Sequence, residues 1–368
     1  MEYGRRELFH KALLGAAAAH RIPAAAATTK KLGIPGPFPG RVIETYHSGC
    51  LVNNAYQAAP IRNMMEKGMK ELTGAPDWTE AWRFFFEPTD VVGIKMTPVG
   101  GKLVCSAPEV LHTIFDGLKQ AGVQAKNIVV YDRYRQQFMS VGYHRWLLEG
   151  VRWMWASEQY DLVQKNIEGY DEKHFMEMAI VTPGEDPRDE RNRRSYIAKF
   201  VTQAVNKIIS FPCLKHHQSA GVTISLKNMS HGFSNNVYRS HLSPTANVCN
   251  YFIPAVVDLP IIRQKVVLHI VDGVKANYDG GPGARREYVW EPKKLYFSTD
   301  PVAIDKIGLK AIDAKRVEAG LKPLISTAEP GKAGNFYHQQ VDHIELAGAI
   351  GLGVFEDAKM DYRKFDLS

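Results

Sequence analysis

The chain has 368 residues, of which 45% are hydrophobic and 23% are charged, a composition that fits a folded globular protein and excludes collagen-like and low-complexity chains. Its formal net charge of +7, from 46 basic and 39 acidic residues, is dispersed, whereas nucleic-acid binding needs a clustered basic face. No apolar run approaches the ~18 residues of a membrane-spanning helix. We therefore expect no nucleic-acid partner and no membrane span.

Residues 1–27 resemble a twin-arginine export signal. Arg5 and Arg6 precede an apolar pair, an alanine-rich middle segment and a second run of alanines. This reading predicts a periplasmic or secreted protein with the twin-arginine export machinery as a partner. The alternative is a frayed amphipathic helix on a protein that stays in the cytoplasm. Under either reading, residues 28–368 are expected to form a single α/β domain with an insertion around 134–200.

The first half of that domain predicts a strand–helix–strand unit. Residues 90–96 form a short apolar run, residues 108–121 carry apolar side chains at helical spacing, and residues 127–131 form a second apolar run. Such units build parallel sheets. Further along, residues 143–149 and 193–205 are expected to be helical.

The second half adds strands at 207–211, 266–271 and 295–297. An Asp-Pro pair at 300–301 predicts the start of a helix that extends to about residue 314. The tail, 347–355, is expected to end in a glycine-rich turn. The predicted fold class is therefore α/β, with a mostly parallel or mixed central sheet flanked by helices.

Polar side chains follow four of the predicted strands. Lys95, Asp132 and Asp272 stand at three strand ends, and the strand at 207–211 leads into Lys215 and His217. Because parallel strands share one carboxyl edge, where open α/β sheets bind ligands, we expect Lys95, Asp132, Lys215 and Asp272 to lie on one rim. A turn or helix-capping role for each residue alone stays open.

The segment from Phe211 to His241 is the richest in chemistry, with lysines, histidines, an arginine and asparagines. Lysine and asparagine can hold a carboxylate or phosphate, and histidine with aspartate can move protons or bind a divalent metal. His217, His241 and Asp272 are the candidate catalytic residues; Lys95, Lys215, Lys227, Asn228 and Arg239 are the candidates for substrate binding; Asp132 and Asp258 are the candidates for orienting them.

Lys227 is expected to face a polar environment whether its segment is extended or helical. Alternation along 222–226 turns it away from the aliphatic face, and in a helix it shares a face with Thr223. A buried lysine needs an anion, which is either a ligand or an internal partner, Asp258 or Asp272. Both alternatives stay open at this stage.

The four cysteines contain no CxxC pair, which argues against a ferredoxin-type cluster, and we expect them to be free and buried. Cofactor motifs of the Rossmann GxGxxG, P-loop and GxSxG types are absent from the sequence. The histidines make a divalent metal the remaining candidate cofactor. The DGGPG stretch at 279–283 predicts a flexible loop or a tight turn.

Several of these segments resemble a prokaryotic family known as domain of unknown function number 362. The resemblance covers roughly residues 90–355 and rests on VVGIKM around Lys95, NIVVYDR around Asp132 and ISFPCLKHHQSAGVTISLKN from Ile209 to Asn228. The shorter stretches YRSHL, VVDL, HIVDGV, GGPG and STDPVAID continue it. The resemblance implies an α/β domain in which a lysine, a spacer and a histidine follow a strand, and it implies no established reaction.

Two functions remain. The first is an exported enzyme that acts on a small anionic substrate at the rim of the sheet, with or without a bound metal or organic cofactor. The second is a non-catalytic periplasmic binding protein for an anionic ligand or metal. A perturbed titration of His217 or a stoichiometric metal would favour the enzyme, and tight binding without turnover would favour the binding protein.

Overall fold

The computed structural model of the protein describes residues 31–241, 247–324 and 341–368. The expected export signal at 1–27 lies outside these residues. The folded elements described below all lie in one compact unit, Leu32–Ser368. Within the described ranges, no helix combines the length and the apolarity needed to cross a membrane.

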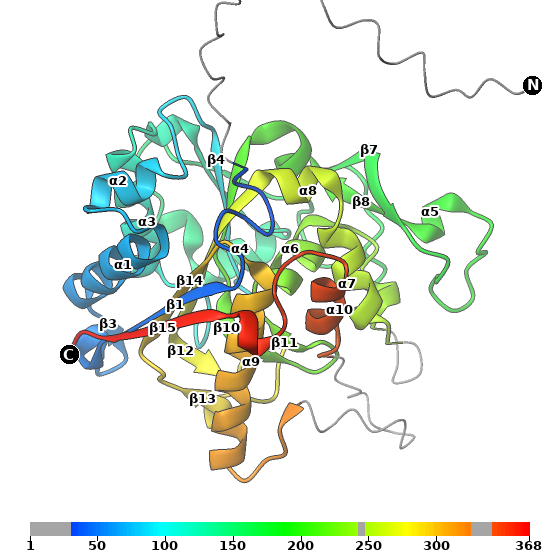
Figure 1. The fold of residues 1–368 in the computed structure, drawn as a ribbon. Helices are drawn as coiled ribbons and strands as arrows, with labels where there is room; N and C mark the ends of the chain where they lie inside the picture. The colour runs from blue at the N-terminus through cyan, green and yellow to red at the C-terminus, as the bar shows by residue number, and fades with distance from the viewer. Residues whose placement is uncertain (1–30, 242–246, 325–340) are drawn as a thin grey trace, which may run out of the picture. The chain divides into compact units, whose positions relative to one another are not determined.

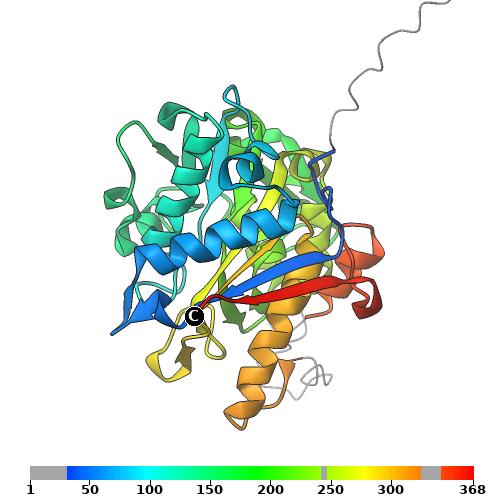
Figure 2. The same ribbon diagram turned by 60° about the vertical axis from the view of Figure 1, so that its left-hand side comes forward.

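A mixed sheet forms the centre of the molecule, with its main strands in the order β15-β1-β14-β12-β9-β4-β5-β6 (Figure 1). Strands β4, β5, β6 and β9 pair in parallel, and β12 is parallel to β9 but antiparallel to β14. The two terminal strands β1 and β15 lie side by side in both views (Figures 1 and 2). The bounds are β1 Arg41–Tyr46, β4 Val92–Lys95, β5 Ile128–Tyr131, β6 Arg152–Met154, β9 Lys207–Ser210, β12 Val266–Asn277, β14 Lys294–Ser298 and β15 Asp361–Asp366.

Helices cover both faces of the sheet, and two hydrophobic cores result. Along β5, Ile128 and Val130 pack into one core while Val129 and Tyr131 pack into the other, because alternate side chains leave a strand on opposite faces. The first core contains α1 (Ala58–Thr73), α2 (Trp78–Arg83), α3 (Pro108–Gln120) and α4 (Arg135–Val141); the second contains α6 (Ser225–Phe233), α7 (Cys249–Val257), α8 (Pro260–Lys265), α9 (Pro301–Glu318) and α10 (His343–Ala349). The predicted α/β fold class is confirmed.

Shorter elements complete the described chain. They are the strands β2 (Leu51–Val52), β3 (Ala55–Tyr56), β7 (Tyr170–Glu177), β8 (Arg194–Ala198), β10 (Cys213–His217), β11 (Gly221–Thr223) and β13 (Val289–Trp290), the helix α5 (Glu190–Arg193), and 3-10 turns at Ser48–Cys50, Ala125–Asn127, Tyr143–Arg145, Tyr238–Ser240, Arg286–Tyr288 and Asp357–Lys359. Of these, β10 matters most here, because it pairs with β12 and β11 and carries predicted site residues.

Two predicted elements are wrong, and one is too short. Residues 194–198 form β8 rather than a helix, because they pair with β7, and a π-helix at Phe200–Ala204 follows. The predicted helix at 143–149 is only a 3-10 turn. The strand predicted at 266–271 continues to Asn277, since β10 and β13 supply pairing partners for its second half.

The predicted start of α9 is confirmed. The Asp300 carboxylate accepts hydrogen bonds from the backbone N–H groups of Val302 and Ala303, both at 2.9 Å. Its second oxygen accepts from Gly40 and Val354, both at 2.8 Å. One buried side chain therefore caps α9 and joins it to segments near both ends of the folded chain.

Candidate functional site

A cavity of about 390 Å³ lies where β4, β5 and β10 end, next to α6. This is the carboxyl edge at which open α/β sheets bind ligands. Among the described residues, its lining includes four basic side chains, Lys95, Arg133, Lys215 and Lys227, and one acidic side chain, Asp132. We call this cavity the pocket.

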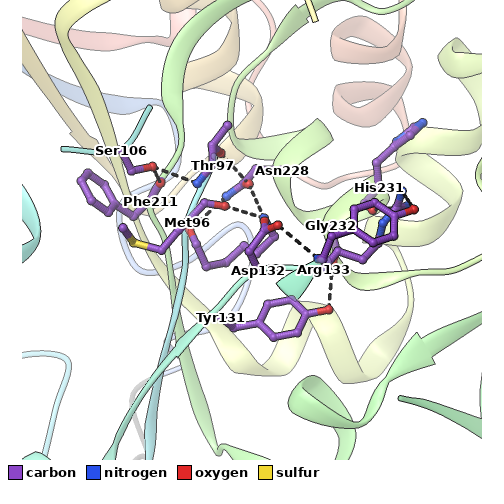
Figure 3. Close-up of polar contacts among 12 residues, drawn as sticks. Met96, Thr97, Ser106, Tyr131, Asp132, Arg133, Phe211, Asn228, His231 and Gly232 are labelled. Carbon is purple, nitrogen blue, oxygen red and sulfur yellow. Dashed lines mark hydrogen bonds and ion pairs between the residues drawn. The ribbon is translucent and has the colours of Figure 1, made fainter. Parts of the chain in front are cut away.

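Lys95 and Asp132 neutralise each other at one wall of the pocket. Asp132 and Asn228, both hydrogen-bonded to Lys95, are labelled in Figure 3. The Nζ atom of Lys95 lies 2.7 Å from Oδ1 of Asp132 and also donates to Oδ1 of Asn228 at 3.1 Å and to the Met96 carbonyl at 2.5 Å. Asn228 Oδ1 also accepts from Thr97 Oγ1 at 2.9 Å. The ammonium donors of Lys95 are therefore fully used inside the protein.

Helix α6 carries Lys227 and Asn228, and a neighbouring helix holds its first turn. The residue before α6 provides no side-chain cap. Instead, the buried carboxylate of Asp305 in α9 accepts hydrogen bonds from the backbone N–H groups of Ser225 at 2.7 Å and Leu226 at 3.0 Å. This contact supplies the acceptor that a helix N-terminus needs and fixes the position of α6.

The last turn of α6 rests on the buried guanidinium of Arg133. Its Nη1 atom donates to the carbonyls of His231 at 2.8 Å and Ser234 at 3.2 Å, and Nη2 donates to Oε1 of Gln164 at 3.2 Å. A cation at a helix C-terminus is favourable because the exposed carbonyls there carry partial negative charge. Arg133 is therefore occupied in holding α6 rather than free to bind a ligand.

Lys227 differs from these cations because its Nζ atom has no hydrogen-bond or ion-pair partner among the described residues. Its side chain is only 6% exposed and lines the pocket. Burial is the main cause that lowers the pKa of Lys227 to about 7, and the nearby cations Lys215 and Arg133 act in the same direction. Thr223 also lines the pocket, but it is the last residue of β11 and Lys227 lies in α6, so the two do not share a helix face as the helical alternative expected.

Lys215 is the second buried amine of the pocket. Its Nζ atom donates to the Pro282 carbonyl at 2.5 Å, and burial lowers its pKa to about 8. Lys215 and His217 both line the pocket, as expected for alternate residues of a strand. The intervening His216 accepts at Nδ1 from the Gly281 N–H at 2.9 Å. A Cβ at Gly281 would lie 2.0 Å from the His216 carbonyl, so this glycine lets the 279–283 loop approach β10.

Three imidazoles lie together beside Lys227. The ring centroid of His241 is 6.0 Å from that of His217 and 5.5 Å from that of His231. His217 Nδ1 accepts the Ser219 N–H at 3.0 Å, which places the His217 ring proton on Nε2, whereas both ring nitrogens of His231 contact serine hydroxyls. Burial lowers the pKa of His241 to about 3 and that of His217 well below its usual range, so both rings are neutral at pH 7.

Two predicted site residues lie away from the pocket because other groups hold them. Arg239 donates to the backbone carbonyls of Met178 at 3.0 Å and Ile180 at 2.8 Å, which secures the segment after β7. Asp258 lies at the end of α7 and forms an ion pair with Arg263 at 2.8 Å. Neither contributes to the lining of the pocket.

Asp272 also lies away from the pocket, so the expected rim contains Lys95, Asp132 and Lys215 but not the fourth residue. The expectation failed because β12 does not end at Asp272 but continues to Asn277. The Asp272 carboxylate accepts the Ala107 N–H at 2.9 Å, at the start of α3. Burial raises its pKa to about 7. Asp272 therefore supports α3 on the opposite face of the sheet from α6.

The side chains of the described residues are not arranged to bind the divalent metal that the sequence left as a candidate cofactor. Across 31–241, 247–324 and 341–368, no group of three or more His, Cys, Asp or Glu side chains is arranged to hold a metal ion. The one acidic side chain in the described lining is paired with a lysine. All four cysteines are free, as predicted, and three of them are buried.

The outer part of the pocket is lined by residues that were not predicted from the sequence as site residues. Val99, Tyr160 and Leu162 line it, and all three are exposed. They lie outside the named strands and helices, where single apolar residues carry no periodic signal. No local pattern in the sequence could have placed them together.

Comparisons with known proteins identify a family and, among the solved structures that match, a distant likeness. The model of the family described as "Domain of unknown function (DUF362)" matches residues 94–310. A crystal structure of a protein from Thermotoga maritima is 13% identical in sequence, with a TM-score of 0.41 over 72% of this chain and 60% of that chain. The chain thus spans less than two thirds of that protein. No curated protein matches the chain.

Proposed function

The chain belongs to the DUF362 family, and because that family is described only as a domain of unknown function, we propose a function from the pocket itself. The protein is an enzyme that binds a small anionic substrate at Lys215 and Lys227 and transfers a proton through His217 and His241. The observation that carries the proposal is the buried Lys227 amine, which has no partner within the part of the chain that the structure describes.

Anion binding follows from the charge balance of the pocket. Lys95 is paired with Asp132, and Arg133 donates to carbonyls of α6, so Lys215 and Lys227 supply the unbalanced positive charge. Burying an unpaired ammonium costs several kcal/mol, and a bound anion offsets that cost by supplying the missing charge. A carboxylate and a phosphate both have the required charge and acceptor oxygens.

Proton transfer is the chemistry that the neutral imidazoles support. His217 presents an N–H donor at Nε2, which suits a hydrogen-bond donor to a substrate oxygen, and it becomes an acid only once the ring is protonated. His241, whose ring lines the same pocket, is the candidate base. An anion bound at Lys227 raises the pKa of both rings, because nearby negative charge favours the protonated form. Substrate binding therefore brings His241 towards the range in which it can accept a proton.

The paired arginines support a place for this enzyme outside the cytoplasm. We propose that residues 1–27 direct export by the twin-arginine machinery to the periplasm or beyond. Replacing Arg5 and Arg6 together with lysine should retain the protein in the cytoplasm of its native host. Unchanged export of that variant, measured by cell fractionation, would overturn the assignment.

Calorimetric titration with inorganic phosphate and with acetate tests the anion site. Lys227→Met should abolish binding without lowering the melting temperature, because the substitution removes a buried charge that none of the described residues pairs with. The control is Lys173→Met at an exposed position away from the pocket. Equal binding by wild type and Lys227→Met, or no binding by the wild type, would refute the anion site. Binding of carboxylates without chemical change, followed by NMR, would favour the non-catalytic binding protein instead.

A further inference from the structure

The chemistry of the pocket changes from its depth to its mouth. Lys215 and Lys227, at the inner end, are 0% and 6% exposed. Val99, Tyr160 and Leu162, which line the same cavity, are 41%, 48% and 59% exposed. The cavity that holds the buried amines is therefore also lined by apolar side chains that reach solvent.

Exposed apolar side chains are concentrated at the outer part of the pocket, which we call the apolar mouth (Val99, Tyr160 and Leu162). The large apolar side chains that are exposed among the described residues number eleven, and three of them line this one cavity. They come from two separate segments, the turn after β4 and the stretch between β6 and β7, and Tyr160 is fixed by an edge-on contact with Tyr134, with 5.6 Å between ring centroids. Scattered exposed apolar residues need no explanation, but a group at a cavity mouth marks a binding surface.

The size of the cavity points to a ligand larger than an inorganic ion. Its volume of about 390 Å³ falls within the ~300–1,000 Å³ of sites that hold small organic molecules. One water molecule takes about 30 Å³ of liquid. Acetate or phosphate at the two lysines would therefore leave most of the cavity to water.

We propose that the substrate is an amphipathic organic anion, with its charged group at Lys215 and Lys227 and an apolar group of several carbons against Val99, Tyr160 and Leu162. This inference rests on the proposed anion site and adds the chemical class of its ligand. The buried amines recognise the charge, and the apolar mouth removes the hydrocarbon part from water.

A chain-length series tests the proposal. Calorimetric titration of the full-length protein with acetate, butanoate, hexanoate and octanoate should give rising affinity, because each fully buried methylene is worth about 0.8 kcal/mol, or roughly fourfold in affinity. Since the mouth is partly exposed, we expect about twofold per methylene, so hexanoate should bind at least ~10-fold more tightly than acetate. Hexyl phosphate, measured alongside, distinguishes a phosphate ester from a carboxylate as the charged group.

A matched pair of variants tests whether the dependence of affinity on chain length arises at the apolar mouth. Leu162→Ser should weaken hexanoate binding several-fold and leave acetate binding unchanged. Val163→Ser should change neither, because Val163 is 50% exposed but does not line the pocket. Acetate binding with no dependence on chain length would overturn the inference and leave the anion site intact, as would equal effects of the two variants. Failure of every anion to bind would overturn both proposals.

Discussion

The amine of Lys227 should make the stability of the protein depend on pH in an unusual direction. Its pKa falls from 10.5, the ordinary value for lysine, to about 7 in the folded state. Between these two values the unfolded chain binds more protons than the folded chain, so the free energy of unfolding rises with pH. Below pH 7 both states carry the charged amine, and the folded state bears the full cost of burying it.

The magnitude follows from the same two values. Each unit of pKa difference corresponds to 1.36 kcal/mol, so the charged amine costs the folded state about 5 kcal/mol at pH 6. At pH 9 the folded-state amine is neutral, and the remaining cost is about 2 kcal/mol. Lys227→Met removes this dependence altogether. The stability advantage of Lys227→Met over wild type should therefore shrink by about 3 kcal/mol between pH 6 and pH 9.

Urea unfolding of both proteins at the two pH values, without added anions, measures the effect. Lys173→Met, at an exposed position, serves as the control and should show no such change with pH. Saturating anion at pH 6 should reduce the difference, since the ligand supplies the missing charge. If the difference between Lys227→Met and wild type stays constant from pH 6 to pH 9, Lys227 is not a buried, unpartnered amine.

Two further substitutions test the framework of the pocket. Gly281→Ala places a methyl group against backbone, so it should destabilise the protein by about 1–3 kcal/mol and weaken acetate binding. The control variant Gly283→Ala has nothing within 4 Å of its new Cβ and should change neither stability nor acetate binding. Similar unfolding midpoints and acetate affinities for both variants would contradict this account. Asp305→Ala leaves two buried N–H groups of α6 without an acceptor, so it should lower the free energy of unfolding, measured in urea, by about 2–4 kcal/mol. A decrease below about 0.5 kcal/mol would show that the cap is dispensable.

Local sequence patterns predicted the inner part of the pocket well. The alternation of strand side chains correctly placed Lys215 and His217 on one side and His216 on the other. That prediction succeeded because it depends only on the period of a strand. The helical spacing expected for Thr223 and Lys227 does not apply, because Thr223 ends β11 and Lys227 lies in α6. The roles of these residues remain predictions.

The failures depended on partners far away in the chain. Asp272 was expected at a strand end, but pairing with β10 and β13 prolongs β12, and neither contact has a local signal. Arg239 carries the charge of a ligand-binding residue, yet backbone carbonyls about 60 residues away hold it. The apolar mouth around Leu162 is likewise assembled from loops. Tertiary contacts, rather than propensities, decide such positions.

The cap on α6 also bears on how the protein is made. The N–H groups of Ser225 and Leu226 are capped by the carboxylate of Asp305, which lies 80 and 79 residues later in the chain. At the usual ~5–20 residues per second of synthesis, the segment that becomes α6 is made roughly 4–16 seconds before Asp305 is added. Ribosome-bound fragments that stop short of α9 therefore lack the carboxylate that caps α6 in the complete structure. The pocket is thus a late product of folding, completed only after most of the chain has been synthesised.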